Sequence, residues 1–145
     1  MDARPLSPTL FVSDQIAPAD LEQAAALGIS LVVNNRPDGE SSGQPSGSAI
    51  EQAAKAAGLE YAAIPIDHTG FGADKVDALA ALLAEHEGRA LLYCRSGTRS
   101  TLLWALAQAT AGVPLAEIYA AAEATGYSLQ PVAGHLQALS AQHEG

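Results

Sequence analysis

Residues 89–111 read RALLYCRSGTRSTLLWALAQATA, and they carry the clearest indication of the fold class in the sequence. Its first part, RALLYC (Arg89 to Cys94), is a short apolar run typical of a strand that is buried on both faces of a sheet. Its last part, Ser100 to Ala111, is apolar enough to predict a well-buried helix. A turn that carries Gly97 joins the two. A strand that passes through such a turn into a helix predicts an anion cradle at the strand's end.

Strand-like and helix-like segments alternate along the rest of the chain, which predicts an α/β fold with parallel pairing and right-handed crossovers. We expect a single domain over residues 1–145: a three-layer sandwich with a small, mostly parallel sheet of about four strands flanked by helices. The expected strands are Thr9 to Ser13, Ser30 to Asn35, Leu59 to Ile66 and Arg89 to Cys94. The expected helices are Ala17 to Leu27, Ser48 to Ala57, Asp74 to Glu87, Ser100 to Ala111, Pro114 to Thr125 and Pro131 to His143.

Composition excludes several classes of function. The formal charge of −9 and the pI near 4.6 argue against nucleic acid and anionic membranes as partners. A single Cys excludes an internal disulfide and a Cys-rich metal centre, and the four His show no metal-ligand spacing. We therefore expect no metal and no cofactor. The N-terminus, MDARPLSPTL, is too polar for a signal peptide, so we expect a cytoplasmic protein. The sequence does not indicate the oligomeric state.

The turn from Cys94 to Arg99 has the composition of a nucleophile held in an anion site. Backbone amides and the helix dipole would stabilise the Cys94 thiolate, and the planar fork of Arg99 can bind an oxyanion with two hydrogen bonds. The expected anion-binding residues are Arg95, Ser96, Gly97, Thr98 and Ser100, of which Ser100 could cap the helix and donate to the thiolate. The alternative is an inert thiol in an ordinary turn, but two of only 7 basic residues fall here, which favours anion chemistry.

Polar residues also follow the strand that ends at Asn35. Asn35 and Arg36 would share a sheet edge with Cys94 if the strands are parallel, and would then form a possible pocket wall. An Asx-type turn before Pro37 explains them slightly better. Residues 36–47, RPDGESSGQPSG, are the longest loop signal in the chain. This loop is either a mobile surface segment or the rim of a site.

The loop YCRSGTRS resembles two related kinds of site. One belongs to the tyrosine and dual-specificity phosphatases, whose loop is one residue longer, and the other to rhodanese-like sulfurtransferases. Four residues separate Cys94 from Arg99, which is the rhodanese length. Together with NNRPDGE, GQPS, AAGLEY and LWALAQA, the loop resembles one bacterial family over about residues 1–140. That family is the β-lactamase hydrolase-like protein phosphatase-like domain, also described as a sulfur transferase family, and it implies a tyrosine/dual-specificity phosphatase-like fold.

The resemblance implies two chemistries for the same loop. In phosphatase chemistry Cys94 attacks phosphorus and Arg99 holds the transferring group, while Asp67, in YAAIPIDH, matches the family's general acid, with His68 as a possible helper. In sulfur transfer Cys94 carries a persulfide between a donor and an acceptor such as thiosulfate or glutathione persulfide, and no acid is needed. Sulfur transfer is our leading hypothesis. A phosphate group with three oxygens needs a wide ring of hydrogen-bond donors, and a loop that is one residue shorter narrows this ring, whereas a single sulfur atom still fits. Hydrolysis of a phospho-substrate is the alternative, followed by a non-catalytic anion-binding or redox-sensing domain.

Overall fold

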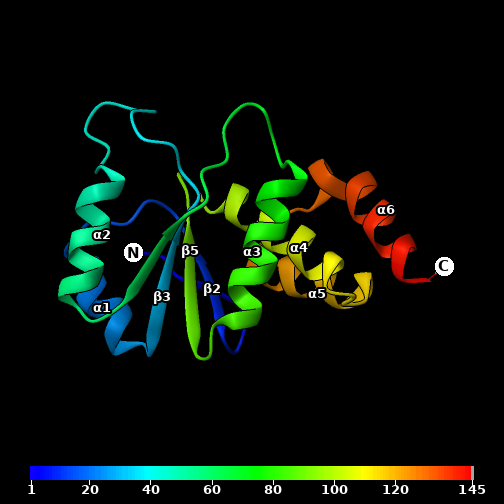
Figure 1. Cartoon of the computed structure of the whole chain (residues 1–145), viewed down its shortest axis with the longest axis horizontal. Helices are drawn as coiled ribbons and strands as arrows, with labels where there is room; N and C mark the ends of the chain where they lie inside the picture. Colours follow the sequence, from blue (N-terminus) through cyan, green and yellow to red (C-terminus); the bar gives the residue numbers. More distant parts are fainter. Residues whose placement is uncertain (145) are drawn as a thin grey trace.

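A computed structural model describes residues 1–144 (Figure 1). The strands are β1 (Arg4–Ser7), β2 (Leu10–Ser13), β3 (Ile29–Asn34), β4 (Glu60–Ala63) and β5 (Arg89–Tyr93). The helices are α1 (Asp20–Ala26), α2 (Gly47–Ala56), α3 (Ala73–Glu85), α4 (Thr98–Thr110), α5 (Leu115–Thr125), the short 3-10 helix η1 (Gln130–Val132) and α6 (Ala133–Glu144). None of the described helices is long and apolar enough to cross a membrane.

The sheet has five strands in the order β1-β2-β5-β3-β4. Strands β2, β5, β3 and β4 pair in parallel, and β1 pairs antiparallel with β2 at one edge. The prediction of a small, mostly parallel sheet is confirmed. The prediction missed β1, whose sequence RPLS is short and contains a Pro, a residue that sheets accept mainly on edge strands. Because the four parallel strands run in one direction, their carboxyl ends meet at a single edge of the sheet.

Helices cover both faces of the sheet, as the predicted three-layer sandwich requires. Helices α1 and α2 lie on one face, and α3 to α6 lie on the other (Figure 1). The side chains of β3 alternate between two cores: Leu31 and Val33 pack on the side of α3 to α6, and Val32 packs on the side of α1 and α2. Strand β5 divides in the same way, with Leu92 and Leu91 in the two cores.

Helix α4 lies at the centre of the larger helical layer and packs against α3, α5 and α6. It is buried on nearly every side, as its apolar sequence predicts. It begins at Thr98, two residues before the predicted start at Ser100. Gly97 is the N-cap, with φ of 90°, and its carbonyl accepts the first helical hydrogen bond from the Thr101 N–H at 3.0 Å. Our prediction used the usual preference for Ser as an N-cap, but only Gly takes this backbone angle readily.

Candidate active site at the carboxyl end of the sheet

Cys94 directly follows β5, between the ends of two neighbouring strands. The Cys94 N–H donates to the Ser13 carbonyl of β2 at 3.4 Å, and the Asn35 N–H donates to the Tyr93 carbonyl at 2.8 Å. One residue further on, the Arg95 carbonyl accepts from the Gln15 N–H at 3.2 Å. The start of the loop is therefore fixed from both sides. Cys94 itself is 0% exposed.

The loop that follows Cys94 presents backbone donors. Among the amides from Arg95 to Ser100, the Gly97 N–H donates to the Cys94 Sγ at 3.1 Å and the Thr98 N–H donates to the Ser96 Oγ at 3.4 Å. The amides of Arg95, Ser96, Arg99 and Ser100 donate to no acceptor in the described residues. Free amides in a turn that opens a helix form a site for negative charge. Four amides without an acceptor therefore lie in the loop beside Cys94, and the Gly97 amide contacts its sulfur, which fits the predicted anion cradle.

Tyr127, from the segment after α5, holds the outer side of this loop. Its hydroxyl donates to the Ser96 carbonyl at 3.0 Å, and its ring lies under the Arg4 guanidinium, 5.4 Å from the ring centroid. The hydroxyl also occupies the space that a Cβ at position 97 would need, so Gly97 is required by contact as well as by its φ. Burial raises the pKa of Tyr127, which keeps the hydroxyl a donor.

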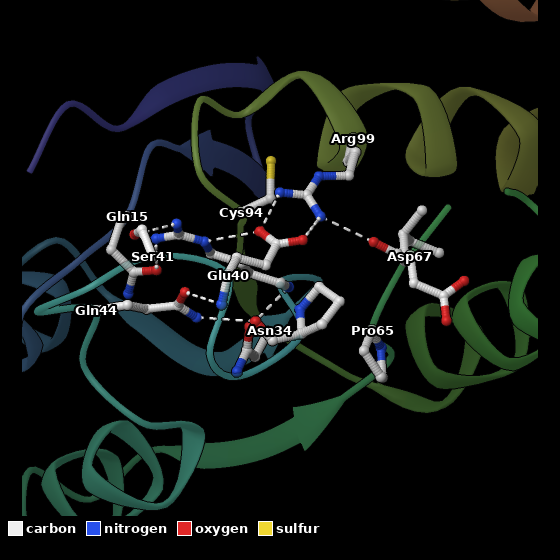
Figure 2. Close-up of polar contacts among 12 residues, drawn as sticks. Gln15, Asn34, Glu40, Ser41, Gln44, Pro65, Asp67, Cys94 and Arg99 are labelled. Atoms are coloured by element: carbon white, nitrogen blue, oxygen red, sulfur yellow. Dashed lines mark hydrogen bonds and ion pairs between the residues drawn. The ribbon is translucent and has the colours of Figure 1, made fainter. Parts of the chain in front are cut away.

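Arg99 points back from the first turn of α4 toward Cys94 (Figure 2). Its Nη1 and Nη2 atoms each donate to one oxygen of the Glu40 carboxylate at 2.8 Å, and Nη1 also donates to the Ile66 carbonyl at 2.8 Å. Figure 2 shows the Cys94 sulfur pointing away from the Glu40 carboxylate. Glu40 therefore holds the end of the guanidinium and does not lie over the sulfur. The Nε–H of Arg99 has no acceptor in the described part of the chain, which leaves the side edge of the guanidinium for an oxyanion.

Glu40 is shared between two arginines. The Arg36 Nε donates to the Glu40 Oε1 at 2.9 Å, and the other Arg36 nitrogens donate to the Gln15 Oε1 and the Ser41 Oγ. Arg36 is only 5% exposed, so the Glu40 carboxylate compensates a buried charge. Hydrogen bonds from Arg99 first, and from Arg36, lower the pKa of Glu40 to about 2. The carboxylate is therefore ionised at any ordinary pH, and it raises the pKa of Arg99.

The sequence analysis did not single out Glu40. It left open whether residues 36–47 form a mobile loop or a rim, and the structure places this loop against the site through the contact of Glu40 with Arg99. The loop is ordered from within: the Gln44 side chain accepts from the Glu40 N–H at 3.0 Å and donates to the Pro37 carbonyl at 2.9 Å. A signal was available, because Glu40 follows Arg36 by four residues in a loop at a strand end.

Two of the expected pocket residues have different positions from those we predicted. Asn35 is 0% exposed, so it lines no open pocket. Its side chain donates to the Ile64 carbonyl at 2.9 Å and accepts from the Ser100 Oγ at 2.8 Å. Ser100 therefore neither caps α4 nor donates to the thiolate, because Gly97 is the cap and Asn35 takes the hydroxyl proton. Arg36, likewise buried, supports Glu40 and does not form an open wall.

Asp67 and His68 lie on the exposed segment between β4 and α3, and the structure does not bring them to Cys94. The Asp67 carboxylate points away from Cys94 and Arg99 (Figure 2). It accepts hydrogen bonds from the Thr69 amide and hydroxyl, and these bonds lower the pKa of Asp67. Asp67 is therefore an ionised acceptor here and not a proton donor. The link to the site is the Ile66 carbonyl, one residue earlier, which Arg99 holds.

The remaining loop residues are arranged around the cradle. Ser96 and Thr98 are exposed, and the Ser96 hydroxyl donates to the Thr98 Oγ1 at 3.0 Å. Arg95 is exposed, and no described residue accepts a hydrogen bond from its side chain or pairs with it. Among the described residues no group of three or more His, Cys, Asp or Glu side chains could hold a metal ion. The chemistry of the site rests on a thiol, a guanidinium and amides.

Cys94, the backbone amides without acceptors and Arg99 lie together in one loop, and the comparison with known families says which kind of domain carries it. Residues 2–111 match the family described as β-lactamase hydrolase-like protein, phosphatase-like domain. The chain belongs to this family. The match includes the Cys94 loop and the Glu40 loop of this β-lactamase hydrolase-like phosphatase-like domain, whereas Tyr127 lies outside the matched residues.

The curated relatives that carry this family name are longer proteins, and the chain matches only a part of each. The β-lactamase hydrolase-like protein of Agrobacterium fabrum is 34% identical over 112 residues, which is 77% of this chain and 26% of that protein. The β-lactamase hydrolase-like protein of Xylella fastidiosa (strain Temecula1) is 34% identical over 121 residues, or 83% of this chain and 28% of that protein. The chain thus spans about a quarter of the length of these relatives.

Solved structures support the same assignment. The crystal structure of a phosphatase candidate from Neisseria meningitidis Z2491 is 34% identical, with a TM-score of 0.81 over 93% of this chain and 96% of that chain. The structure of Tk-PTP in its active form has a TM-score of 0.72 over 95% of both chains at 20% identity, and this likeness concerns the fold alone. The chain is a phosphatase-like domain with the tyrosine/dual-specificity phosphatase fold.

Proposed function

We propose that this domain hydrolyses phosphate monoesters through a covalent phosphoryl–Cys94 intermediate. The observation that carries the proposal is the set of hydrogen-bond donors left without an acceptor in the Cys94 loop: the amides of Arg95, Ser96, Arg99 and Ser100, with the open edge of the Arg99 guanidinium. A transferring phosphoryl group distributes negative charge over three oxygens and needs many donors. The family and the 34% identical Neisseria structure support this reading over sulfur transfer, which was our leading hypothesis from the sequence.

The first step is attack of the Cys94 thiolate on phosphorus. The S–P bond forms while the bond from phosphorus to the leaving oxygen breaks, and that oxygen takes a proton. The amide of Gly97, which donates to the sulfur at 3.1 Å in the free domain, stabilises the thiolate before attack. Arg99 binds the oxygens of the phosphoryl group in flight, so it stabilises charge that spreads in the transition state.

The second step is hydrolysis of the intermediate. Water attacks phosphorus and gives a proton to the Asp67 carboxylate, which lost its own proton to the leaving oxygen in the first step. The S–P bond breaks, the thiolate of Cys94 reforms, and inorganic phosphate leaves. Glu40 takes no proton in either step, because its pKa of about 2 keeps it ionised. It acts as a positioning residue, holding two nitrogens of Arg99 so that the third faces the substrate.

Asp67 is the proposed general acid, and its position in the free structure means that it has to move to reach the leaving oxygen. The segment after β4 has to turn so that the carboxylate leaves Thr69 and faces the leaving oxygen. Breaking the bonds with Thr69 removes the largest causes that lower the pKa of Asp67, so the same movement would make the group a better proton donor. A leaving group that is a weak base needs no such help.

Sulfur transfer is the second candidate, and one observation favours it. The expected general acid, Asp67, points away from the sulfur (Figure 2). A persulfide pathway does not need an acid, because its leaving groups are weak bases. Cys94 would accept a sulfane sulfur from a donor such as thiosulfate and pass it to a thiol acceptor, with the same amides holding the outer sulfur.

The experiment that tests the proposal compares both reactions in the same protein. Hydrolysis of p-nitrophenyl phosphate and transfer of sulfur from thiosulfate to cyanide are measured for the wild type and for Cys94→Ser. We expect Cys94-dependent phosphate release, and sulfur transfer no faster than in Cys94→Ser. Cys94-dependent thiocyanate formation without phosphate release would reverse the order of the two candidates. Phosphate release that survives in Cys94→Ser would reject covalent catalysis by this residue.

A further inference from the structure

The basic side chains of the domain are almost all engaged. Of the 7 Lys and Arg residues, six donate to a carboxylate or a backbone carbonyl in the described structure. Arg95 is the exception among residues 1–144, because its side chain is exposed and has no such partner. In a chain with a formal charge of −9, this free cation stands directly after the nucleophile.

The charges within the site make Arg95 more important than its exposure suggests. Arg36 and Arg99 share the single carboxylate of Glu40, so this cluster keeps one net positive charge. Arg95 adds a further guanidinium at the loop, exposed and without a partner in the described residues. It is therefore the group that can attract a further anion to this part of an acidic domain.

The position of Arg95 is fixed although its guanidinium is free. The Arg95 carbonyl accepts from the Gln15 amide at 3.2 Å, and the preceding residue is held by the Ser13 carbonyl. The side chain therefore starts from an anchored backbone at the rim of the cradle. A ligand contact there requires ordering of one side chain only, which keeps its entropic cost small.

We propose that Arg95 selects phosphate esters whose leaving group carries a second anionic group, a carboxylate or another phosphate. This inference rests on the proposed phosphatase function and names the substrate class for that site. The ester phosphate lies in the amide cradle against Arg99, and the second anion pairs with Arg95 outside the cradle. The two arginines thus have separate roles, Arg99 in catalysis and Arg95 in specificity.

The test is a binding measurement that needs no turnover. Isothermal titration calorimetry compares 3-carboxyphenyl phosphate with 3-carbamoylphenyl phosphate, which has nearly the same shape and lacks the second charge, on the Cys94→Ser protein at low salt. We expect the carboxylate to bind about 2- to 5-fold more tightly, the range for an exposed charge pair, and the advantage to shrink as salt is added. Adding Arg95→Gln removes this advantage, and adding Arg95→Glu reverses it.

Arg89→Gln is the matched control, because it removes the same charge at the other end of β5, where Arg89 donates to the Leu27 carbonyl. This control keeps the preference for the carboxylate. Equal binding of the two ligands in the parent protein, or a preference that survives Arg95→Gln, would overturn the inference. Inorganic phosphate, titrated in the same series, separates the two proposals: if phosphate binds and the preference is absent, only the role of Arg95 fails. If phosphate does not bind at all, the anion cradle and the phosphatase function fail with it.

Discussion

At the scale of single residues, the site depends on a carboxylate that never meets the substrate. Arg99 could adopt many rotamers at the start of α4, and two hydrogen bonds of 2.8 Å to Glu40 select one of them. Glu40 is itself fixed by the buried Arg36. The Arg99 guanidinium is therefore oriented before any ligand binds, and in the proposed reaction the entropic cost of ordering it would not add to the barrier.

This arrangement predicts the effect of Glu40→Gln. The amide cannot accept two hydrogen bonds from Arg99 and another from Arg36, so the guanidinium loses its orientation. We expect kcat/KM for an aryl phosphate to fall on the order of 10²-fold, the scale for misplacing a catalytic group, with much of the loss in kcat. Steady-state kinetics check this, with Glu51→Gln, which removes the exposed pair of Glu51 with Lys55, as the control.

If Glu40 instead blocked the anion site, Glu40→Gln would raise the affinity for inorganic phosphate and the activity above those of the wild type rather than lower them. Glu40→Asp adds a further check, because it keeps the charge on a shorter side chain. Partial recovery of kcat in Glu40→Asp relative to Glu40→Gln is expected from a positioning role.

The role of Asp67 is tested with leaving groups of different basicity. Asp67→Asn should lower the rate with phenyl phosphate, a poor leaving group, by about 100-fold, and should affect p-nitrophenyl phosphate far less. Sulfur transfer, if the domain performs it, should be nearly unchanged. The same small effect on both aryl phosphates would remove Asp67 from the mechanism and fit its outward position in the free structure (Figure 2).

At the scale of elements, the junction between β5 and α4 is the decisive piece of structure. Gly97 has φ of 90° and lies against the Tyr127 hydroxyl, so a side chain at this position is disfavoured twice. Gly43, in the loop that carries Glu40, has φ of 80° but nothing within 4 Å of the place of a Cβ. Substituting each glycine in turn therefore separates the free-energy cost of backbone strain from the cost of a steric clash with Tyr127.

We therefore expect Gly97→Ala to be more harmful than Gly43→Ala. Both substitutions lower the free energy of unfolding by about 1–3 kcal/mol through an unfavourable backbone angle. Only Gly97→Ala also displaces Tyr127 and the loop carbonyl that it holds. Thermal unfolding should show the larger loss for Gly97→Ala, and phosphatase activity should fall sharply in that variant alone. Equal stability and activity of the two variants would mean that Tyr127 does not brace the loop.

Local sequence predicted the elements well where a pattern was strong. The run RALLYC predicted β5, and the apolar segment after it predicted α4, because both signals extend over several residues. The start of α4 was wrong by two residues, since the left-handed conformation of Gly97 decides it and residue preference alone suggested Ser100. Strand β1 was missed because its pairing with β2, and not its own composition, makes it a strand.

At the scale of the whole molecule, the site is assembled from segments far apart in the chain. Glu40 and Arg99 are 59 positions apart, and Tyr127 contacts the loop across 31 positions. Sequence could place Cys94 and Arg99 together because they share one turn. The sequence could not show that Glu40 contacts Arg99 or that Asp67 points outward. It also could not show that Asn35 accepts a hydrogen bond from the Ser100 hydroxyl. These contacts depend on the paths of loops over the edge of the sheet.

The ion cluster of Arg36, Glu40 and Arg99 should make the free energy of unfolding of the domain depend on pH. The pKa of Glu40 is about 2 in the folded domain, against an ordinary value of 4.5, so the unfolded chain binds more protons between these values. The stabilising contribution of Glu40 is therefore fully present above about pH 4.5 and is lost as the pH falls toward 2. Urea unfolding of the wild type and Glu40→Gln should show a stability difference that shrinks over this range. A difference that stays constant from pH 6 to about 2.5 would contradict the assigned ion cluster.

The most direct test of the central claim is to trap the intermediate on Cys94. Asp67→Asn protein is mixed with p-nitrophenyl phosphate, quenched rapidly in acid and analysed by intact-protein and peptide mass spectrometry, beside a sample incubated with thiosulfate. We predict a gain of one phosphoryl group on the peptide that carries Cys94, absent in Cys94→Ser, and no gain of a sulfur atom from thiosulfate. A transferable sulfur atom on Cys94, with no phosphoryl adduct and no phosphate release, would contradict the account and identify the loop as a sulfur carrier.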